Sequence, residues 1–285
     1  MALKLSVIGT GYLGATHAAC MASLGFEVIG YDTDASKIDL LSKAKVPFYE
    51  PDLEELLAAQ IKSGRLTFTK NINDLATADV HFICVGTPQV KGGNAADLSY
   101  VNSALEGIAK IVKPGGLVVG KSTVPVGTAN NLRDRLIALN PKADLAWNPE
   151  FLREGFAVED TLKPNRLVVG VVSDEAEKIL KEVYAANLKE NTPWVRADLP
   201  TAELVKVAAN SFLATKISFI NAMAEVCEAS GGDITVLAKA IGYDPRIGSR
   251  FLQAGIGFGG GCLPKDIRAF MARAEELGAK QAVEF

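Results

Sequence analysis

A single cysteine lies in a glycine-rich segment near the end of the sequence, and charged residues follow it closely. Residues 255–261 contain five glycines, and Cys262, Lys265 and Asp266 come next. Glycines leave a thiol accessible, and a neighbouring lysine favours the thiolate, which is the nucleophilic form of cysteine. Asp266 can take a proton from water or from a substrate. The segment could also be a turn, but it lacks the Gly-Lys-Ser/Thr ending of a phosphate-binding P-loop.

A lysine and an asparagine share one face of a long predicted helix. Lys206 and Asn210 are four residues apart, and valines and alanines surround them. Lysine is unusual in such apolar company. Its side chain either extends to solvent or, if it faces a reacting group, stabilises an alkoxide or oxyanion.

The segment GTGYLG, residues 9–14, follows the first apolar run and begins a helical pattern. In this context Gly9 permits a tight turn, Gly11 lets the backbone approach a pyrophosphate, and Gly14 lets the helix lie close to the sheet. Asp32 ends the next apolar run, where a carboxylate accepts hydrogen bonds from a ribose and repels a 2′-phosphate. The pattern therefore predicts an NAD site.

Three further apolar runs end in polar, proline-containing turns: VGTP at 85–88, KSTVP at 121–125 and WNPEFLREG at 147–155. Because ligands bind at the carboxyl ends of parallel strands, Thr87, Thr123 and Glu150 are expected on one rim with the glycine-rich turn. Any one of these turns could instead be an ordinary loop.

The chemistry suggested by these residues is an oxidation that continues beyond the aldehyde. The only histidines, His17 and His81, lie in a helical pattern and a buried strand pattern, so neither is expected to act as the base. A thiolate adds to an aldehyde, a hydride leaves, and water hydrolyses the thioester. Lys206 with Asn210 would stabilise the oxyanion. Asp266, or Thr123 with Glu150 through water, would handle the proton.

The elements that must position these residues alternate between strand and helix, which predicts an α/β fold with a mostly parallel, Rossmann-type sheet. Strands are expected at 3–8, 27–31, 66–69, 80–85, 117–121, 144–147, 166–170 and 193–197. Helices are expected at 12–24, 52–62, 98–112, 127–139 and 174–186. The alternation of strand and helix patterns ends at residue 201. About thirty residues without glycine or proline follow, and they predict one long helix. Further helical signals lie at 233–241 and after Asp266. The predicted domains are 1–200, which binds NAD, and 201–285, which is mostly helical.

Composition excludes several other classes of protein. The 285 residues are 48% hydrophobic and carry a formal net charge of −3, which gives no basic surface for nucleic acid. No apolar run is long enough to span a membrane, so a cytoplasmic location is expected. The four cysteines are widely separated, which argues against a disulfide framework or a zinc site, and no metal is expected.

In combination, these motifs resemble one known family, the UDP-glucose/GDP-mannose dehydrogenases. GTGYLG, VPFYEPDLEELL, VGTP, KSTVPVGT, NPEFLREG, the helix with Lys206 and Asn210, GYDPRIGSRFLQAGIGFGG and CLPKD occur in the order typical of that family. The resemblance implies two successive NAD-dependent oxidations, which convert the C6 alcohol of a nucleotide sugar to a carboxylate through a cysteine thioester. FLQAGIGFGG favours UDP-glucose as the substrate, and the long helix is implied to form a homodimer.

The resemblance also assigns roles to individual residues. Catalysis falls to the nucleophile Cys262 and to Lys206, Asn210, Asp266, Thr123 and Glu150. The cofactor is placed at Gly9, Gly11, Tyr12, Leu13, Gly14, Asp32, Lys37, Thr87, Thr123, Glu154 and Lys265. The sugar nucleotide is placed at Phe151, Leu152, Arg153, Glu154, Lys206, Asn210, Phe251, Leu252, Gln253, Ala254, Gly255 and Gly259, with Arg246 reaching it across a subunit interface.

Two departures from the family pattern are visible. Gly261 stands where the family usually has serine, and family members continue into a third domain, which covers the uridine portion and which this sequence is expected to lack. Three alternatives stay open. The enzyme could oxidise another nucleotide sugar such as GDP-mannose, it could be a β-hydroxyacid dehydrogenase that forms one NADH per substrate, or it could be a catalytically silent NAD-binding dimer.

Overall fold

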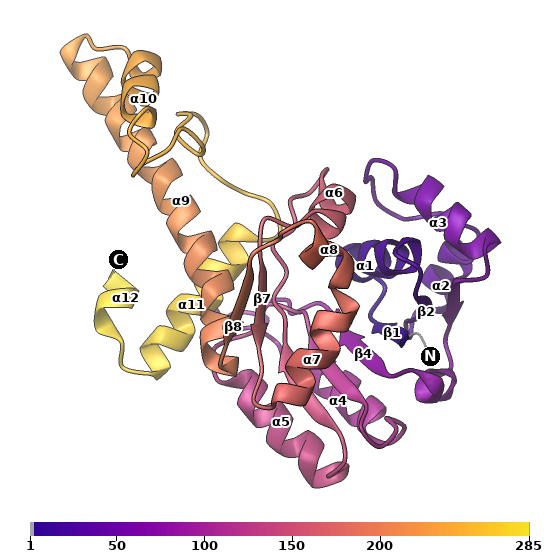
Figure 1. Cartoon of the computed structure of the whole chain (residues 1–285). Coiled ribbons are helices and arrows are strands. Elements are labelled where there is room, and N and C mark those ends of the chain that lie inside the picture. The colour runs from indigo at the N-terminus through magenta and orange to yellow at the C-terminus, as the bar shows by residue number, and fades with distance from the viewer. Residues whose placement is uncertain (1–2, 285) are drawn as a thin grey trace. The chain divides into compact units, whose positions relative to one another are not determined.

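The chain forms an eight-stranded sheet followed by a helical segment, as the computed structural model of residues 3–284 shows (Figure 1). The chain divides into two compact units. The first runs to Pro88 and continues from Ala96 to Leu204, and the second combines Gln89–Ala95 with the chain from Val205 onward. We describe each unit by itself.

The sheet of the first unit has the strand order β3-β2-β1-β4-β5-β6-β7-β8. The first six strands are parallel and follow the doubly wound dinucleotide-binding order. β7 pairs antiparallel with β6, and β8 pairs parallel with β7. The strands are β1 (Lys4–Ile8), β2 (Glu27–Tyr31), β3 (Leu66–Thr69), β4 (Val80–Ile83), β5 (Leu117–Gly120), β6 (Asp144–Trp147), β7 (Leu167–Gly170) and β8 (Trp194–Ala197).

Helices connect these strands and cover both faces of the sheet. They are α1 (Tyr12–Ser23), α2 (Ala35–Leu41), α3 (Leu53–Lys62), the 3-10 helix η1 (Ile72–Thr77), α4 (Ser99–Ala109), α5 (Thr128–Leu139), α6 (Ala157–Leu162), α7 (Asp174–Val183) and α8 (Ala185–Lys189). Local capping explains several starts. The Ser173 hydroxyl accepts a hydrogen bond from the Ala176 amide at α7, and Asp34 caps α2 in the same way.

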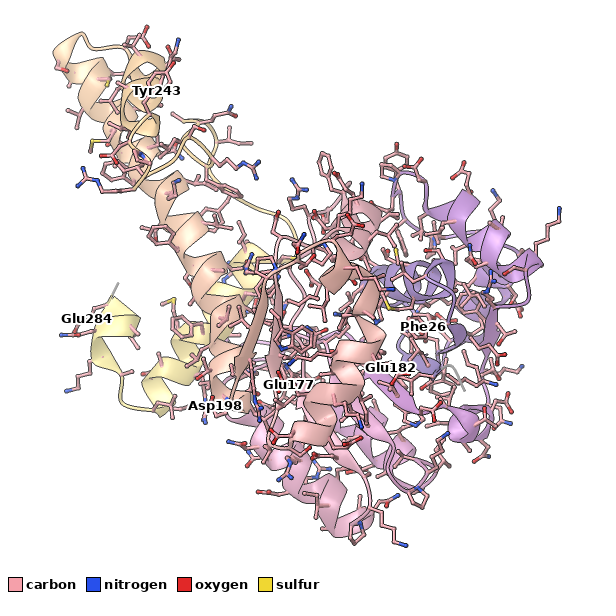
Figure 2. All side chains as sticks on the ribbon, in the orientation of Figure 1. Phe26, Glu177, Glu182, Asp198, Tyr243 and Glu284 are labelled. Atoms are coloured by element: carbon pink, nitrogen blue, oxygen red, sulfur yellow. The ribbon has the colours of Figure 1, made fainter. Side chains whose placement is uncertain are left out.

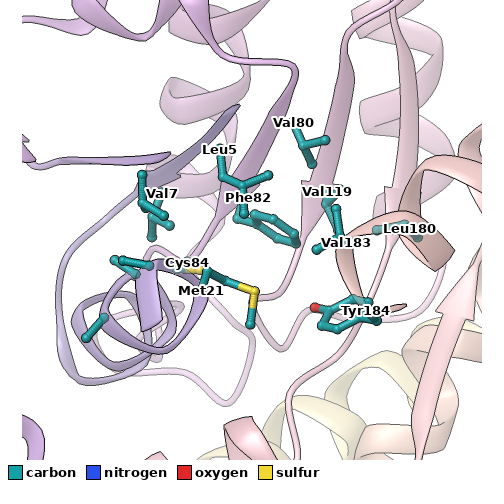
Figure 3. Packing of buried hydrophobic residues seen from close by; sticks show 14 of the residues in the cluster. Leu5, Val7, Met21, Val80, Phe82, Cys84, Val119, Leu180, Val183 and Tyr184 are labelled. Carbon is teal, nitrogen blue, oxygen red and sulfur yellow. The ribbon is translucent and has the colours of Figure 1, made fainter. Parts of the chain in front are cut away.

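A buried apolar cluster lies between one face of the sheet and the helices α1, α3 and α7, and Figure 3 shows part of it. Leu5 and Val7 of β1 and Phe82 of β4 point to this face because successive side chains of a strand alternate. Met21 of α1 and Leu180 of α7 pack against them. α4 and α5, which contact each other and also β4 and β6 respectively, cover the opposite face. The continuous apolar runs in the sequence reflect this burial on both faces.

The edge strand β8 is held to α7 by polar contacts. Glu177 of α7, which Figure 2 labels, accepts hydrogen bonds from the Trp194 indole at 2.9 Å and from Arg196 at 2.7 Å. Asp198 then accepts one from the Thr201 amide at 2.7 Å, in the first turn of the next helix. That helix, α9 (Leu199–Ser230), leads out of the first unit.

The second unit is helical. Beyond α9 it contains α10 (Ile234–Gly242), α11 (Leu263–Glu276) and α12 (Lys280–Glu284). The segment between α10 and α11 is tied to α9, because Lys216 donates to the Ile247 carbonyl at 3.0 Å and Asn221 accepts from the Gly255 amide at 2.8 Å. α11 lies beside the part of α9 that carries Asn210, whose amide donates to Asp266 at 2.8 Å.

The expected fold class is confirmed, and the differences are local. The short helices α2 and α6 were not expected. The expected helix 174–186 ends at Val183, and α8 begins at Ala185. α11 begins at Leu263, so Asp266 lies in its first turn rather than before it.

Candidate active site

The glycine-rich turn between β1 and α1 has the geometry of a dinucleotide cradle. Gly9 has φ +87°, and a Cβ on Gly14 would lie 1.8 Å from the Gly9 carbonyl oxygen. A Cβ on Gly11 would meet no protein atom within 4 Å, and would project instead into the space where a phosphate approaches the helix. The turn therefore fits a pyrophosphate at the start of α1.

Asp32 lies at the end of β2 and is buried in a set of hydrogen-bond donors. Its carboxylate accepts from the Thr10 amide at 2.8 Å, the Asp34 amide at 3.1 Å and the Lys37 ammonium at 2.7 Å. Burial favours the protonated form, but the bonds from Lys37, Asp34 and Thr10 outweigh it and hold the pKa of Asp32 below its ordinary value. Asp32 thus stays ionised and can accept hydrogen bonds from a ribose.

These residues surround one cavity of about 440 Å³, within the size range of ligand pockets. Gly9, Gly11, Asp32 and Lys37 line it, together with Tyr100 of α4. The structure thus brings together four of the residues expected at the cofactor. Leu13 instead lines a smaller cavity, and Tyr12 turns its hydroxyl toward Glu50.

Two of the expected rim residues are joined at the ends of β4 and β5. The Thr87 hydroxyl donates to the Thr123 carbonyl oxygen at 2.7 Å. Ser122 braces the same turn by donating to the Val85 carbonyl oxygen at 2.7 Å. The rim between these strands is therefore built from hydroxyl-to-backbone bonds, which leave little freedom for Thr123.

The loop after β6 carries Glu150 and the expected substrate residues. The Glu150 carboxylate accepts a hydrogen bond from the Leu152 amide. Arg153 makes a two-pronged ion pair with Asp160, and the Arg166 guanidinium lies 3.9 Å from the centre of the Phe151 ring. The loop ends at Gly155, which has φ +83°.

A buried lysine beneath this loop was not anticipated from the sequence. Lys121 follows β5, and its ammonium donates to Asn148 at 3.0 Å, which also accepts from the Tyr184 hydroxyl at 2.6 Å. Burial lowers the pKa of Lys121. With Glu150 and His17 it lines a cavity of about 70 Å³. The available signal was a lysine at the end of an otherwise apolar strand, LVVGK.

Both histidines are buried in the first unit. His17 packs its ring against Phe82 with 4.5 Å between the ring centres, and His81 is hydrogen-bonded to Ser6 at 2.7 Å. Burial lowers the pKa of His81 to about 4, and it also lowers the pKa of His17 well below its ordinary value. Both rings are therefore neutral and enclosed near neutral pH, in keeping with the structural roles expected for them.

In the second unit, the candidate nucleophile stands at the start of α11. Cys262 is exposed at the N-cap position, and Pro264 lies in the first turn that follows. Gly257 and Gly260 of the preceding segment have φ +93° and +79°, conformations that other residues rarely adopt. The glycines thus shape the turn that leads to an accessible thiol.

In the first turn of α11, Asp266 makes polar contacts with the buried Asn210 and with the half-buried Lys265. The Asp266 carboxylate accepts from Asn210 at 2.8 Å and from Lys265 at 2.7 Å, and it is 3% exposed. Lys206, one helical turn before Asn210, is only 6% exposed, so its side chain does not extend to solvent. The structure therefore brings Asn210, Lys265 and Asp266 together.

The remaining expected substrate residues lie between α10 and α11. Phe251 has φ +64°, Leu252 is buried, and the Gly255 amide is held by Asn221. Arg246 is exposed and pairs with Asp244 at 2.6 Å. Gln253, Ala254 and Gly259 are exposed in the same segment.

Among residues 3–284, no helix combines the length and the apolar character that crossing a bilayer requires.

Comparison with known proteins assigns both parts of the chain. Residues 3–188 match the NAD binding domain of the UDP-glucose/GDP-mannose dehydrogenase family, and residues 200–284 match its central domain. A UDP-glucose 6-dehydrogenase of Rhizobium meliloti (strain 1021) is 44% identical over 279 residues, which are 96% of this chain and 64% of the relative.

Solved structures agree with this assignment. A UDP-glucose dehydrogenase from the hyperthermophilic archaeon Pyrobaculum islandicum aligns with TM-score 0.93 and 41% identity over 99% of this chain and 67% of its own. A GDP-mannose dehydrogenase from Pseudomonas aeruginosa aligns with TM-score 0.80 and 34% identity, over 97% of this chain and 65% of its own. The chain spans about three fifths of the length of the curated relatives it matches.

Proposed function

Because the chain belongs to the UDP-glucose/GDP-mannose dehydrogenase family, we propose that the protein oxidises UDP-glucose to UDP-glucuronate with NAD⁺. The observation that carries the proposal is the accessible Cys262 at the start of α11, next along the chain to the buried Asp266 network, in a protein whose other part is an NAD-binding domain. An exposed thiol also calls for a reducing compartment, so we place the reaction in the cytoplasm.

The balance of the reaction defines what the residues must do. One alcohol, two NAD⁺ and one water give one carboxylate, two NADH and three protons. When bound, NAD⁺ accepts a hydride from the sugar carbon in each oxidation. The carboxylate of Asp32 and the backbone at Gly11 would hold the adenosine ribose and the pyrophosphate. Lys37, Thr87, Glu154 and Lys265 are proposed as further cofactor contacts.

In the first oxidation, the C6 hydroxyl loses a proton as its carbon loses a hydride. We assign the proton to a water held by Thr123 and Glu150 or by Asp266. Lys206 and Asn210 would stabilise the alkoxide, because an ammonium and an amide N–H in a buried site interact strongly with developing negative charge. The burial of Lys206 and of Asn210 supports this role.

In the second oxidation, the Cys262 thiolate adds to the aldehyde carbon and forms a thiohemiacetal, whose oxyanion Lys206 and Asn210 would again stabilise. Loss of the second hydride leaves a thioester. Water then attacks the thioester carbon, the carbon–sulfur bond breaks, and the thiolate is restored. Asp266 would accept the proton of the attacking water.

The substrate would lie against the two segments that carry the remaining expected residues. These are Phe151–Glu154 in the first unit and Phe251–Gly255 with Gly259 in the second, with Arg246 contributed by the other subunit. The left-handed backbone at Phe251 and the bond from Gly255 to Asn221 support an ordered segment there. GDP-mannose is the second candidate substrate, favoured by the likeness to the Pseudomonas aeruginosa GDP-mannose dehydrogenase.

We further propose that the protein is a homodimer formed through α9. Phe212, Phe219 and Val226 recur at every seventh residue and are 65%, 49% and 57% exposed. Residues seven apart lie on one stripe of a helix, and an exposed apolar stripe of this kind is typical of a helix that packs against another.

The identity of the substrate is tested by a screen of nucleotide sugars with NAD⁺, in which NADH and the sugar product are measured together. The proposal predicts UDP-glucuronate from UDP-glucose and a much lower kcat/KM for GDP-mannose. A higher kcat/KM for GDP-mannose would identify GDP-mannose as the substrate instead. No NADH from any nucleotide sugar would indicate a silent NAD-binding module.

A further inference from the structure

The loop between α2 and α3 contains a buried carboxylate that the proposed mechanism does not use. Glu50 is 5% exposed and lies in the segment VPFYEPD, which precedes α3. Its side chain accepts hydrogen bonds from the Tyr12 hydroxyl, from the Gly155 amide at 2.9 Å and from the Ala157 amide at 2.7 Å. The donors are a phenol and two backbone amides, all neutral, and they come from parts of the chain far apart in sequence.

Two of these partners belong to segments with an expected role in binding. Tyr12 is the first residue of α1 and the fourth of GTGYLG, where the pyrophosphate of a dinucleotide would lie. Gly155 ends the loop that carries Glu150 and the proposed substrate residues, and Ala157 begins α6. The Gly155 amide lies 3.2 Å from the Tyr12 hydroxyl as well, so the three groups form one closed set of contacts.

Glu50 is itself held firmly in place. Phe48, two residues before it, packs edge-on against the Tyr12 ring with 5.1 Å between the ring centres. Asp52, two residues after it, has φ 62° in the turn that begins α3. Glu54 on α3 pairs with Lys45 and accepts from the Val46 amide, which closes the base of the loop. A segment anchored at both ends can hold its carboxylate in a fixed place.

We propose that Glu50 is a positioning residue that couples the dinucleotide turn to the substrate loop 150–155. A ligand that fixes the first turn of α1 also fixes Tyr12, and through the shared Glu50 oxygen it restrains the Gly155 amide. A carboxylate suits this task because it only accepts hydrogen bonds and has room for several donors. A glutamine would turn an NH₂ group toward donors, so it cannot satisfy the same set. This coupling rests on the proposed function in one respect, namely that residues 150–155 are taken as the loop that binds the substrate.

Hydrogen exchange of the whole chain, with NAD⁺ as the probe, tests this coupling. In the unchanged protein NAD⁺ should slow amide exchange across residues 151–157. In Glu50→Gln those amides should exchange about tenfold faster without NAD⁺, and NAD⁺ should no longer slow them, while β1 and β4 keep their protection. Glu55→Gln, an exposed position on α3, is the matched control and should behave like the unchanged protein.

Tyr12→Phe keeps the experiment decisive if Glu50→Gln fails to fold. It removes only the hydroxyl, so the carboxylate still holds the two amides, and the expected result is a weaker response of 151–157 to NAD⁺ with little loosening beforehand. The proposal would be overturned if NAD⁺ slowed amide exchange of residues 151–157 equally in the unchanged protein and in both variants. It would also be overturned if a folded Glu50→Gln variant exchanged these amides at the unchanged rate.

Turnover separates this inference from the proposed function. Glu50→Gln should raise the KM for the sugar nucleotide by about tenfold while lowering kcat less, because it disturbs the placement of the loop rather than the reacting groups. A protein that oxidises no nucleotide sugar would overturn the proposed function but would leave the exchange result standing, since exchange requires no reaction.

Discussion

At the scale of single residues, the four cysteines differ in their exposure, and this difference bears on which of them could act as the proposed nucleophile. Cys20, Cys84 and Cys227 are buried, whereas Cys262 is exposed. Burial raises the pKa of both Cys20 and Cys84 to about 12, so these two remain protonated and inert. Of the four thiols, only that of Cys262 has the exposure that the proposed nucleophile requires.

Replacement of Cys262 tests this distinction. Cys262→Ser should lower the rate of uronate formation by about a thousandfold or more, because serine is a far weaker nucleophile at neutral pH, and NAD⁺ affinity should not change. Cys227→Ser is the matched control, a buried thiol on α9 that should keep the turnover rate. Steady-state assays and equilibrium NAD⁺ titration measure both quantities. Undiminished uronate formation by Cys262→Ser would show that the glycine-rich segment has only a structural role.

At the scale of elements, the pair formed by β1 and β4 encloses a titratable group. His81 of β4 bonds to Ser6 of β1, and its pKa is lowered from 6.5 to about 4, first by burial and then by Lys113, against an opposing effect of Asp79. In the unfolded chain the ring is protonated below about pH 6.5. In the folded protein it stays neutral until the pH falls to about 4. The unfolding free energy should therefore fall as the pH drops from 6.5 to 4 and should level off below that.

His81→Leu isolates this effect. The fall between pH 7 and pH 4 that His81 causes should be about 3 kcal/mol, from the size of the pKa shift. The variant leaves the Ser6 hydroxyl without its partner, a cost that does not vary with pH, so the slope and not the absolute stability is the readout. Urea unfolding at several pH values measures it. If the unfolding free energy of both proteins changed equally with pH, the claim that His81 is buried in its neutral form would be contradicted.

How much the sequence revealed also depends on the kind of element. Strands such as LVVG and the turn GTGYLG were predictable because burial on both faces and a phosphate turn leave strong local patterns. The antiparallel pairing of β7 with β6 leaves no such pattern, since it depends on how the chain returns. Glu50 was missed for the same reason, whereas Lys121 left a local signal, the lysine that ends LVVGK, but not the identity of its partners. Glu50 meets Gly155 across 105 residues, and its segment looks like an ordinary loop.

At the scale of the whole molecule, the stripe on α9 predicts how copies of the chain associate. The protein should sediment at micromolar concentration as twice its 30.2 kDa mass. Phe219→Asp should shift it to the monomer, because burying an unpaired carboxylate in an apolar contact is costly. Glu228→Ala, an exposed position on another side of the helix, is the control. Analytical ultracentrifugation measures the mass of each protein. An unchanged protein that is monomeric would contradict the proposal that α9 forms a dimer contact.

The central proposal involves both parts of the chain, since two hydrides would leave the sugar carbon, to NAD⁺ bound by the first unit, for every thioester hydrolysed at Cys262. Its most direct test is the ratio of NADH formed to UDP-glucose consumed, measured to completion with the product identified. The account predicts a ratio of two with UDP-glucuronate as the product. A ratio of one, with an aldehyde or ketone accumulating, would contradict it.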